Sequence, residues 1–228
     1  MTALHNAPLQ TLSVTVDESS TTNSVVFLST IPSYISPRHL TSIALFLHER
    51  DYEKVSANAG MYIMTSDVVR PLLAFPNLRK VELYSPLGFC LNDDFVDAMA
   101  LAWSEIHHLS IQGGVSNPTI MVLHSLSRHC PRLQHLWLTV DASYAEMDHP
   151  AGSPRVIQSA LTFWHAQHSP INSSVHVAEL LSSIFPSLSE IYASIDKDEW
   201  EQVGKLVPTY AAIRAHERQL GQAPAVSA

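Results

Sequence analysis

The segment FPNLRKVEL, residues 75–83, decides how this sequence folds, because its pattern returns three more times along the chain. The other copies are WSEIHHLSI from Trp103, CPRLQHLWL from Cys130 and FPSLSEIYA from Phe185. Each copy begins with a bulky residue or Cys, continues with Pro or Ser, and then carries apolar residues at the spacing LxxLxL. Repetition at a nearly constant step predicts a series of similar structural units.

The apolar positions of the four copies predict short strands that turn one face toward a shared core. They are Leu78, Val81 and Leu83; Ile106, Leu109 and Ile111; Leu133, Leu136 and Leu138; and Leu188, Ile191 and Ala193. Because side chains alternate across a strand, the last two apolar residues of each copy share one face. The step from the third copy to the fourth is twice as long as the other steps, so it predicts a weaker copy between them, SALTFWHA, with Leu161 and Phe163 pointing inward.

Two further copies precede Phe75. Leu40, Ile43 and Leu45 obey the same LxxLxL spacing, as do Leu9, Leu12 and Val14. The sequence therefore predicts seven strands, which end near residues 14, 45, 83, 111, 138, 163 and 193.

The segments between the strands have helical periodicity. Apolar residues recur at Phe95, Val96, Met99 and Ala102, and again at Ile120, Leu123 and Leu126. Asn92 or Asp93 is a suitable helix cap, and the Pro of the FPxL copies favours the end of the preceding helix. A strand and a helix that alternate at a step of about 28 residues are typical of leucine-rich repeats. The predicted fold class is therefore α/β, a solenoid of about six or seven irregular repeats with a curved parallel sheet on its concave side and helices on its convex side.

The predicted domain organisation is a repeat domain over residues 1–197, a capping helix over 198–220 and a tail over 221–228. Helical spacing of Trp200, Val203, Leu206 or Val207, Tyr210 and Ile213 supports the capping helix. The alternative is a doubly wound α/β domain, which also alternates strands and helices but normally carries a glycine-rich phosphate loop that this sequence lacks.

Composition excludes several classes of partner and location. The formal net charge is -8, with 13 Lys and Arg against 21 Asp and Glu and no basic run, so we expect neither nucleic acid nor a membrane as partner. No apolar stretch is long enough to span a bilayer, and the first residues lack a secretory pattern, which predicts a cytoplasmic or nuclear protein. The presence of only two cysteines, Cys90 and Cys130, favours a reducing compartment, and a single disulfide between them is the alternative.

No arrangement of residues in the sequence predicts chemistry. The spacing of His124, His129, Cys130 and His135 matches no zinc pattern, and Asp93 and Asp94 are interpreted as charges at a helix start. Nucleophile elbows, phosphate loops and metalloprotease motifs are missing. We therefore expect no enzyme activity, no catalytic residue, no cofactor and no metal.

The side chains on the strand face opposite the core are the candidate site. They include five aromatic residues: Phe46, Tyr84, Trp137, Trp164 and Tyr192. Exposed aromatic side chains are enriched at the centres of protein interfaces. The sequence predicts that these five bind a protein partner on the concave sheet.

The FPxLxxLxL copies, the helix NDDFVDAMALAW and the segments SPINSSVHVAELLSSIFPSLSEI and DEWEQVGKLVPTYAAIRAHERQ resemble the leucine-rich-repeat region of fungal F-box proteins. The resemblance covers roughly residues 9–218. It implies a substrate-reading module of a ubiquitin ligase, in which a separate F-box docks onto a Skp-type adaptor. The first recognisable unit here, LQTLSVTV, is already a repeat, so docking to that adaptor is not expected of this chain. The alternatives are an α/β enzyme with an unrecognised active site and a truncated fragment without independent function.

Overall fold

A computed structural model describes residues 8–17, 21–48, 52–57, 59–114, 116–143 and 156–221. Its strands are β1 Thr11–Asp17, β2 Ser42–His48, β3 Met64–Thr65, β4 Lys80–Tyr84, β5 Phe89–Cys90, β6 His108–Ile111, β7 His135–Leu138, β8 Phe163–Gln167 and β9 Glu190–Ala193. Its helices are α1 Thr21–Tyr34, α2 Tyr52–Ala57, α3 Ser66–Val69, α4 Asp93–Ala102, α5 Val122–His129, α6 Ser174–Ile184 and α7 Lys197–Gly221, with short 3-10 turns at Ala59–Met61 and Arg70–Ala74.

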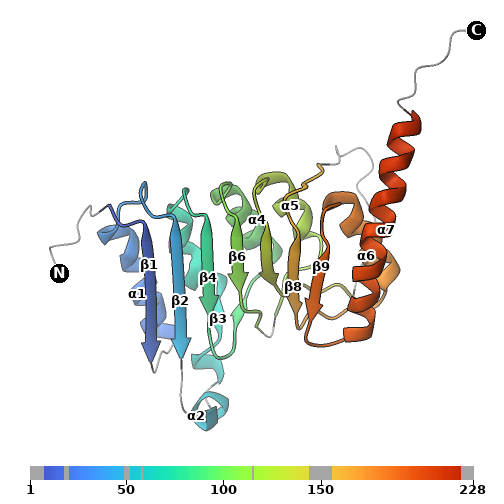
Figure 1. Cartoon of the computed structure of the whole chain (residues 1–228). Coiled ribbons are helices and arrows are strands. Elements are labelled where there is room, and N and C mark those ends of the chain that lie inside the picture. Colours follow the sequence, from blue (N-terminus) through green and yellow to red (C-terminus); the bar gives the residue numbers. More distant parts are fainter. Residues whose placement is uncertain are drawn as a thin grey trace, which may run out of the picture.

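Seven of the strands form one sheet in which spatial order follows chain order. The order is β1-β2-β4-β6-β7-β8-β9, and every neighbouring pair is parallel (Figure 1). The two short strands β3 and β5 pair separately. A doubly wound sheet would reverse its strand order at one point, and the described strands contain no such reversal. The fold is therefore α/β with a parallel sheet that grows in one direction.

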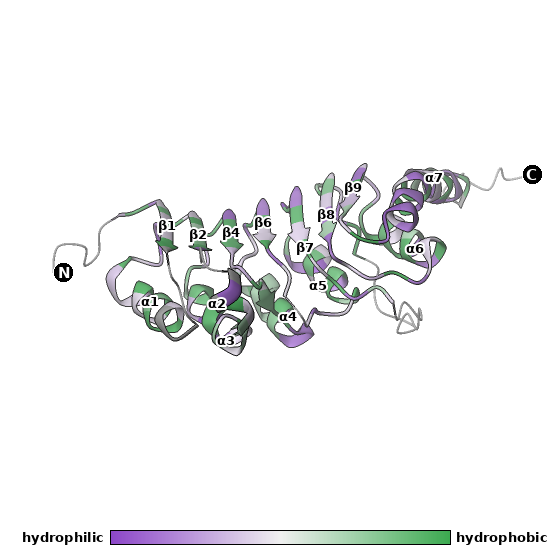
Figure 2. Cartoon of the chain, turned by 90° about the horizontal axis from the view of Figure 1, so that it is seen from below, coloured by the Kyte–Doolittle hydropathy of each residue, from purple (hydrophilic) through white to green (hydrophobic). Residues whose placement is uncertain are grey.

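The helices occupy one face of this sheet. Figure 2 shows α1 and α3 to α6 below a single row of strands, and α7 beyond β9 at the end of that row. The other face carries no helix among the described elements, and we call it the open face. In the described part of the chain, no helix is long and apolar enough to cross a membrane.

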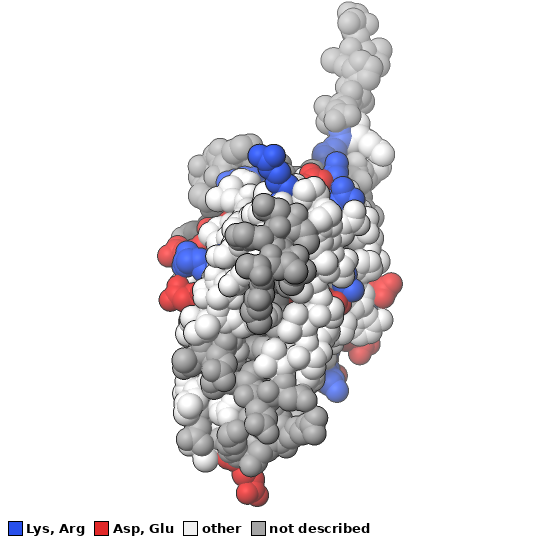
Figure 3. Space-filling view, turned by 90° about the vertical axis from the view of Figure 1, so that its left-hand side faces the viewer, with Lys and Arg blue, Asp and Glu red and all other residues white. Residues whose placement is uncertain are grey.

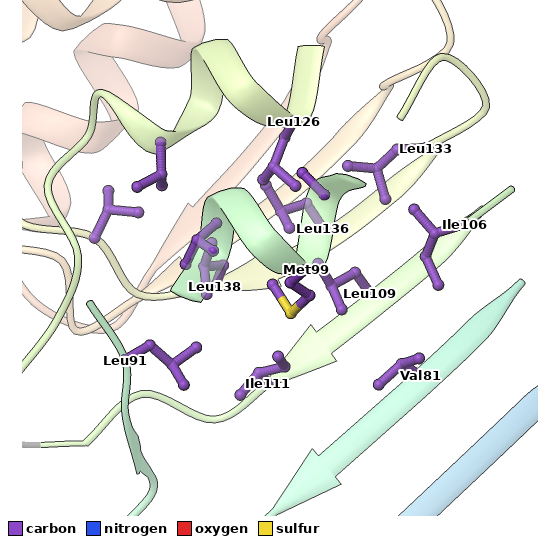
Figure 4. Close-up of a cluster of buried hydrophobic side chains, with 14 of the residues drawn as sticks. Val81, Leu91, Met99, Ile106, Leu109, Ile111, Leu126, Leu133, Leu136 and Leu138 are labelled. Atoms are coloured by element: carbon purple, nitrogen blue, oxygen red, sulfur yellow. The ribbon is translucent and has the colours of Figure 1, made fainter. Parts of the chain in front are cut away.

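The core lies between the sheet and the helices. Strand pairing aligns one row of inward side chains: Leu12, Ile43, Val81, Leu109, Leu136, Trp164 and Ile191. A second row aligns Val14, Leu45, Leu83, Ile111 and Leu138. Figure 4 shows the middle of both rows meeting Met99 of α4 and Leu126 of α5. The apolar positions predicted from the copies at Phe75, Trp103 and Cys130 are all buried.

The weak copy between residues 138 and 188 lies in a different register from the predicted one. Leu161 is buried as expected, but Phe163 points to the open face, and Trp164 and Ala166 are the inward residues. Leu161, Trp164 and Ala166 repeat the LxxLxL spacing one full step after the copy at Cys130. The prediction of Phe163 as an inward residue is therefore wrong.

Polar side chains fix the helix ends. Asn92 caps α4, because its side chain accepts a hydrogen bond from the Phe95 N–H at 3.0 Å. Asp93, the alternative cap, instead accepts hydrogen bonds from the Thr119 N–H at 2.7 Å and the Thr119 hydroxyl at 2.6 Å. Asp93 thus ties the start of α4 to the segment that leads into α5.

The helix α7 closes the β9 end of the core. Trp200 is buried, packs edge-on against Trp164 with ring centroids 5.2 Å apart, and donates from its indole to the Ser169 carbonyl at 3.0 Å. Val203 and Val207 are also buried. Ile213 is half exposed, so the predicted apolar face ends before it. The helix matches the predicted range 198–220 closely, whereas residues 222–228 of the predicted tail lie outside the described residues.

The buried side chain of Gln158 links the segments that lead into β7 and β8. No helix is described between these two strands. The Gln158 amide donates to the carbonyls of Cys130 and Leu133 at 3.2 and 2.7 Å. Its oxygen accepts from the N–H groups of Ala160 and Leu161 at 3.1 and 2.9 Å. These four hydrogen bonds satisfy backbone carbonyl and N–H groups in the two segments, which would otherwise need another partner.

Gly88 is expected to tolerate alanine poorly. Its φ is +68°, and a Cβ there would overlap the Gly113 carbonyl. We expect Gly88→Ala to lower the free energy of unfolding by more than about 1 kcal/mol, measured by urea denaturation. Gly204→Ala is the matched control, because it lies inside α7 with nothing within 4 Å of its new Cβ. That change should stabilise by about 0.5 to 1 kcal/mol. Equal effects of the two substitutions would contradict this account.

Candidate functional site

The side chains on the open face belong to the residues that alternate, along each strand, with the inward residues of the core. The central row across the sheet is Ser13, Ala44, Glu82, Ser110, Trp137, His165 and Tyr192. The row two residues earlier is Thr11, Ser42, Lys80, His108, His135, Phe163 and Glu190. Small and hydroxyl side chains thus occupy the β1 and β2 end of these rows, while aromatic and imidazole rings gather toward β9.

The rings on β6 to β9 form a continuous layer, which we call the aromatic cluster. Its members are His108, His135, Trp137, Phe163, His165 and Tyr192. The closest pair is Trp137 and His165, which stack with centroids 4.4 Å apart and planes within 13°. Phe163 lies 6.0 Å from Trp137 and 5.7 Å from Tyr192. Such mutual packing holds the exposed rings in place before any partner arrives.

A smaller group of rings lies on β2 and β4. Phe46 and His48 stack with centroids 6.5 Å apart, and His48 approaches Tyr84 at 5.5 Å. A cavity of about 290 Å³ lies between this group and the aromatic cluster. Phe46, Glu82 and Tyr84 line one side of it, Ser110 and Gln112 lie between, and Trp137 and His165 line the other side.

An irregularity in β8 shapes one wall of this cavity. Pairing with β9 shifts between His165 and Gln167, and Gln167 has a φ of 57°. The buried Gln167 side chain donates to the Ile111 carbonyl at 2.8 Å and accepts from the Gly113 N–H at 3.1 Å. The Gln167 N–H donates to Nδ1 of His165 at 3.1 Å. The neutral His165 ring therefore carries its proton on Nε2.

Two imidazoles of the aromatic cluster are less basic than usual. Burial lowers the pKa of His165, and the neighbouring His168 lowers it further. Burial also lowers the pKa of His108, more than the nearby Glu82 raises it. Both rings are consequently neutral at pH 7.

Four of the five predicted site residues lie on the open face. Trp137 is 38% exposed, Tyr84 36% and Tyr192 53%, and Phe46 is half-buried. Trp164 is the exception, because it is 0% exposed and donates from its indole to the Leu138 carbonyl at 3.1 Å. The prediction of Trp164 as a partner-binding residue is wrong, and Phe163 and His165 on either side of it occupy the open face instead.

The histidines of the aromatic cluster are the residues that sequence reasoning missed. His108, His135 and His165 belong to the outward positions of their strands. The alternation of side chains that predicts an outward Trp137 also predicts outward rings for His108 and His135. It predicts the same for His165 once the copy on β8 is placed one full repeat after the copy on β7.

The residues considered for metal binding do not assemble. Across the described ranges, no three His, Cys, Asp or Glu side chains are placed to hold a metal ion. Cys130 is buried in the core with its thiol near the carbonyls of Ala100 and Trp103, and burial raises its pKa to about 12. His135 points from β7 to the open face. Both cysteines are free thiols.

Among the described residues, charged groups are sparse on the side of the molecule that Figure 3 presents, which is the β1 end. Blue and red atoms there lie mainly at the margin, in mixed order, and the described surface between them is uncharged.

No protein-family model matches this chain. A comparison with curated protein sequences likewise finds no match.

Proposed function

We propose that this chain is a leucine-rich-repeat solenoid that binds a protein partner on its open face and performs no chemistry of its own. The observation that carries the proposal is the aromatic cluster, a preformed layer of exposed and half-buried rings on a face that the described helices leave uncovered. Monomeric proteins seldom leave such a layer exposed without a use for it, and Trp and Tyr dominate the energetics of protein interfaces.

The solenoid part of the proposal rests on the regularity of the sheet. Inward residues recur at a nearly constant step, at Leu78, Ile106, Leu133, Leu161 and Leu188. Each strand of the seven-stranded sheet pairs in parallel with its neighbours, and the helices share one side. A unit of this kind buries its apolar face only against its neighbours, which is the principle of repeat architectures.

The geometry of the cavity supports a binding role over a catalytic one. Ser110 and His165 both line it, but Trp137 lies between them in the central row. Two strand spacings, about 9.6 Å, separate their backbones. A nucleophile and its base need hydrogen-bond distance, so this pair supplies no activated hydroxyl.

The resemblance to the repeat region of fungal F-box proteins extends the proposal to the kind of partner. By that resemblance, the open face would select proteins for ubiquitination. The proposal does not include docking of this chain to a Skp-type adaptor.

The test is capture of partners by the double variant Trp137→Ala with Tyr192→Ala. Both side chains are exposed, so the variant should fold, with a circular dichroism melt like that of the wild type. We expect the partners recovered by cross-linking with the wild type to be lost. The matched control is Leu101→Ala with Met121→Ala, which removes two exposed apolar side chains on the helical side. Identical sets of partners for all three proteins would refute the proposal.

A further inference from the structure

The cavity on the open face lies over the short side chain of Ser110. Glu82 of β4 and Trp137 of β7 flank Ser110 in the central row. Strand spacing places the backbones of these two residues about 9.6 Å apart. Since Ser110 is short, the space above it is enclosed by a carboxylate on one side and an indole on the other. That width accommodates one long side chain from outside.

The indole of Trp137 has one face free for such a side chain. His165 and Phe163, which both belong to β8, stack on the ring with centroids 4.4 and 6.0 Å from it. The opposite face is therefore on the Ser110 side, where the cavity lies. A cation within about 6 Å of an indole centroid is attracted by the negative face of the ring.

The charge of the cavity is negative at neutral pH. Glu82 is the only Asp or Glu among the described residues that line it, the lining contains His168 but no Lys or Arg, and the lowered pKa of His165 keeps that ring neutral. The whole chain has a formal net charge of -8. An acidic side chain or a phosphate would therefore be repelled here.

Glu82 retains capacity for a partner cation. Its carboxylate lies 3.0 Å from Lys80 Nζ and 3.5 Å from His108 Nε2. Two contacts do not saturate a carboxylate, which offers about four acceptor positions. Lys80 is not part of the cavity lining and is half exposed, so its surface ion pair with Glu82 is weak and can be rearranged.

We propose that the cavity over Ser110 receives an arginine or lysine side chain of a protein partner, which lies against the Trp137 ring and reaches the Glu82 carboxylate. This inference rests on the proposed function and names the chemistry of the partner. Arginine fits better than lysine, because a planar guanidinium stacks on an aromatic face and pairs with a carboxylate at the same time.

The test uses three short peptides as probes at pH 7.5. They are acetyl-Ala-Arg-Ala-amide, the same peptide with citrulline, which has nearly the shape of arginine without its charge, and the same peptide with norleucine. Indole ¹⁵N–¹H signals report binding, because Trp137 is exposed while Trp103, Trp164 and Trp200 donate to buried carbonyls. We expect the arginine peptide to shift the Trp137 signal with a dissociation constant on the order of 1 mM. The citrulline and norleucine peptides should bind about tenfold more weakly.

Two pairs of variants distinguish binding in the cavity from a general effect of surface charge. Glu82→Gln should weaken arginine-peptide binding about fivefold. Glu190→Gln removes the same charge from the same face outside the cavity and should leave binding unchanged. Ser110→Leu should block the cavity, whereas Ser13→Leu, in the same row on β1, should not. The indole spectrum of each variant verifies that it is folded.

Several outcomes would overturn the inference. They are equal binding of the arginine and citrulline peptides, equal weakening by Glu82→Gln and Glu190→Gln, and no shift of the Trp137 signal at about 10 mM peptide. The proposed function is judged separately by partner capture. If capture depends on Trp137 and Tyr192 but the peptides show no preference for charge, the inference fails and the proposed function stands. If capture is unaffected by the double variant, the proposed function itself fails.

Discussion

Replacing Trp200 by alanine is expected to lower the free energy of unfolding by about 3 to 5 kcal/mol. Trp200 is 1% exposed, meets Trp164 edge-on and donates to the Ser169 carbonyl. The substitution removes a fully buried indole of α7 from the end of the core and leaves that carbonyl without its indole donor. Urea denaturation followed by far-ultraviolet circular dichroism measures the change.

The control for this prediction is Trp137→Ala. It removes the same side chain from the open face, where Trp137 is 38% exposed. Its effect should remain within about 1 kcal/mol, because surface substitutions leave no cavity in the core. A loss for Trp200→Ala no larger than that for Trp137→Ala would mean that α7 does not stabilise the sheet.

Substitution of Gln158 by methionine is expected to cost about 3 kcal/mol or more. Methionine is close to glutamine in size and fills the same space, so the loss isolates the polar contacts. The carbonyls of Cys130 and Leu133 and the N–H groups of Ala160 and Leu161 would each lose a hydrogen bond. A buried polar group left without a partner keeps its full desolvation cost.

Gln134→Met provides the comparison, since Gln134 is exposed in the segment that leads into β7. That change should stay within about 0.5 kcal/mol of the wild type. Thermal melts of the two variants, recorded side by side, decide the matter. A melting temperature for Gln158→Met equal to that of Gln134→Met would show that the four bonds contribute nothing.

The strands were predictable because two periods agree in this sequence. The period of two within each strand and the nearly constant step between strands both place Val81, Leu109 and Leu136 on the inner face. The structure confirms this arrangement, and it confirms the parallel sheet. The curvature and the leucine-rich-repeat assignment remain part of the proposal.

The error at Trp164 has a physical origin. In the segment LTFWHA, apolar residues stand at adjacent positions, so alternation alone allows either Phe163 or Trp164 to face inward. The repeat step, counted from Leu136, selects Trp164, and its indole meets both Trp200 and the Leu138 carbonyl. Partners so distant in sequence cannot be inferred from local pattern.

The role of Gln158 could not be predicted either. Helix caps and turns follow short motifs, but the Gln158 amide reaches the backbone carbonyls of Cys130 and Leu133, which belong to the preceding repeat. The aromatic cluster was predictable in part. Its tryptophan and tyrosine follow from alternation, whereas its three histidines were not part of the predicted site.

The partial burial of the first inward residues sets a direction for unfolding. Leu12, Val14 and Val16 of β1 are only partly covered, and so are Ile191 and Ala193 of β9, but at the β9 end the helix α7 packs over the core with its buried Trp200. In a stack of units that contact only their neighbours, opening starts where the terminal interface is weakest and travels inward. The molecule would therefore fray from β1 toward β9, and the rings on β7 to β9 would keep their arrangement while the first strands are already loose.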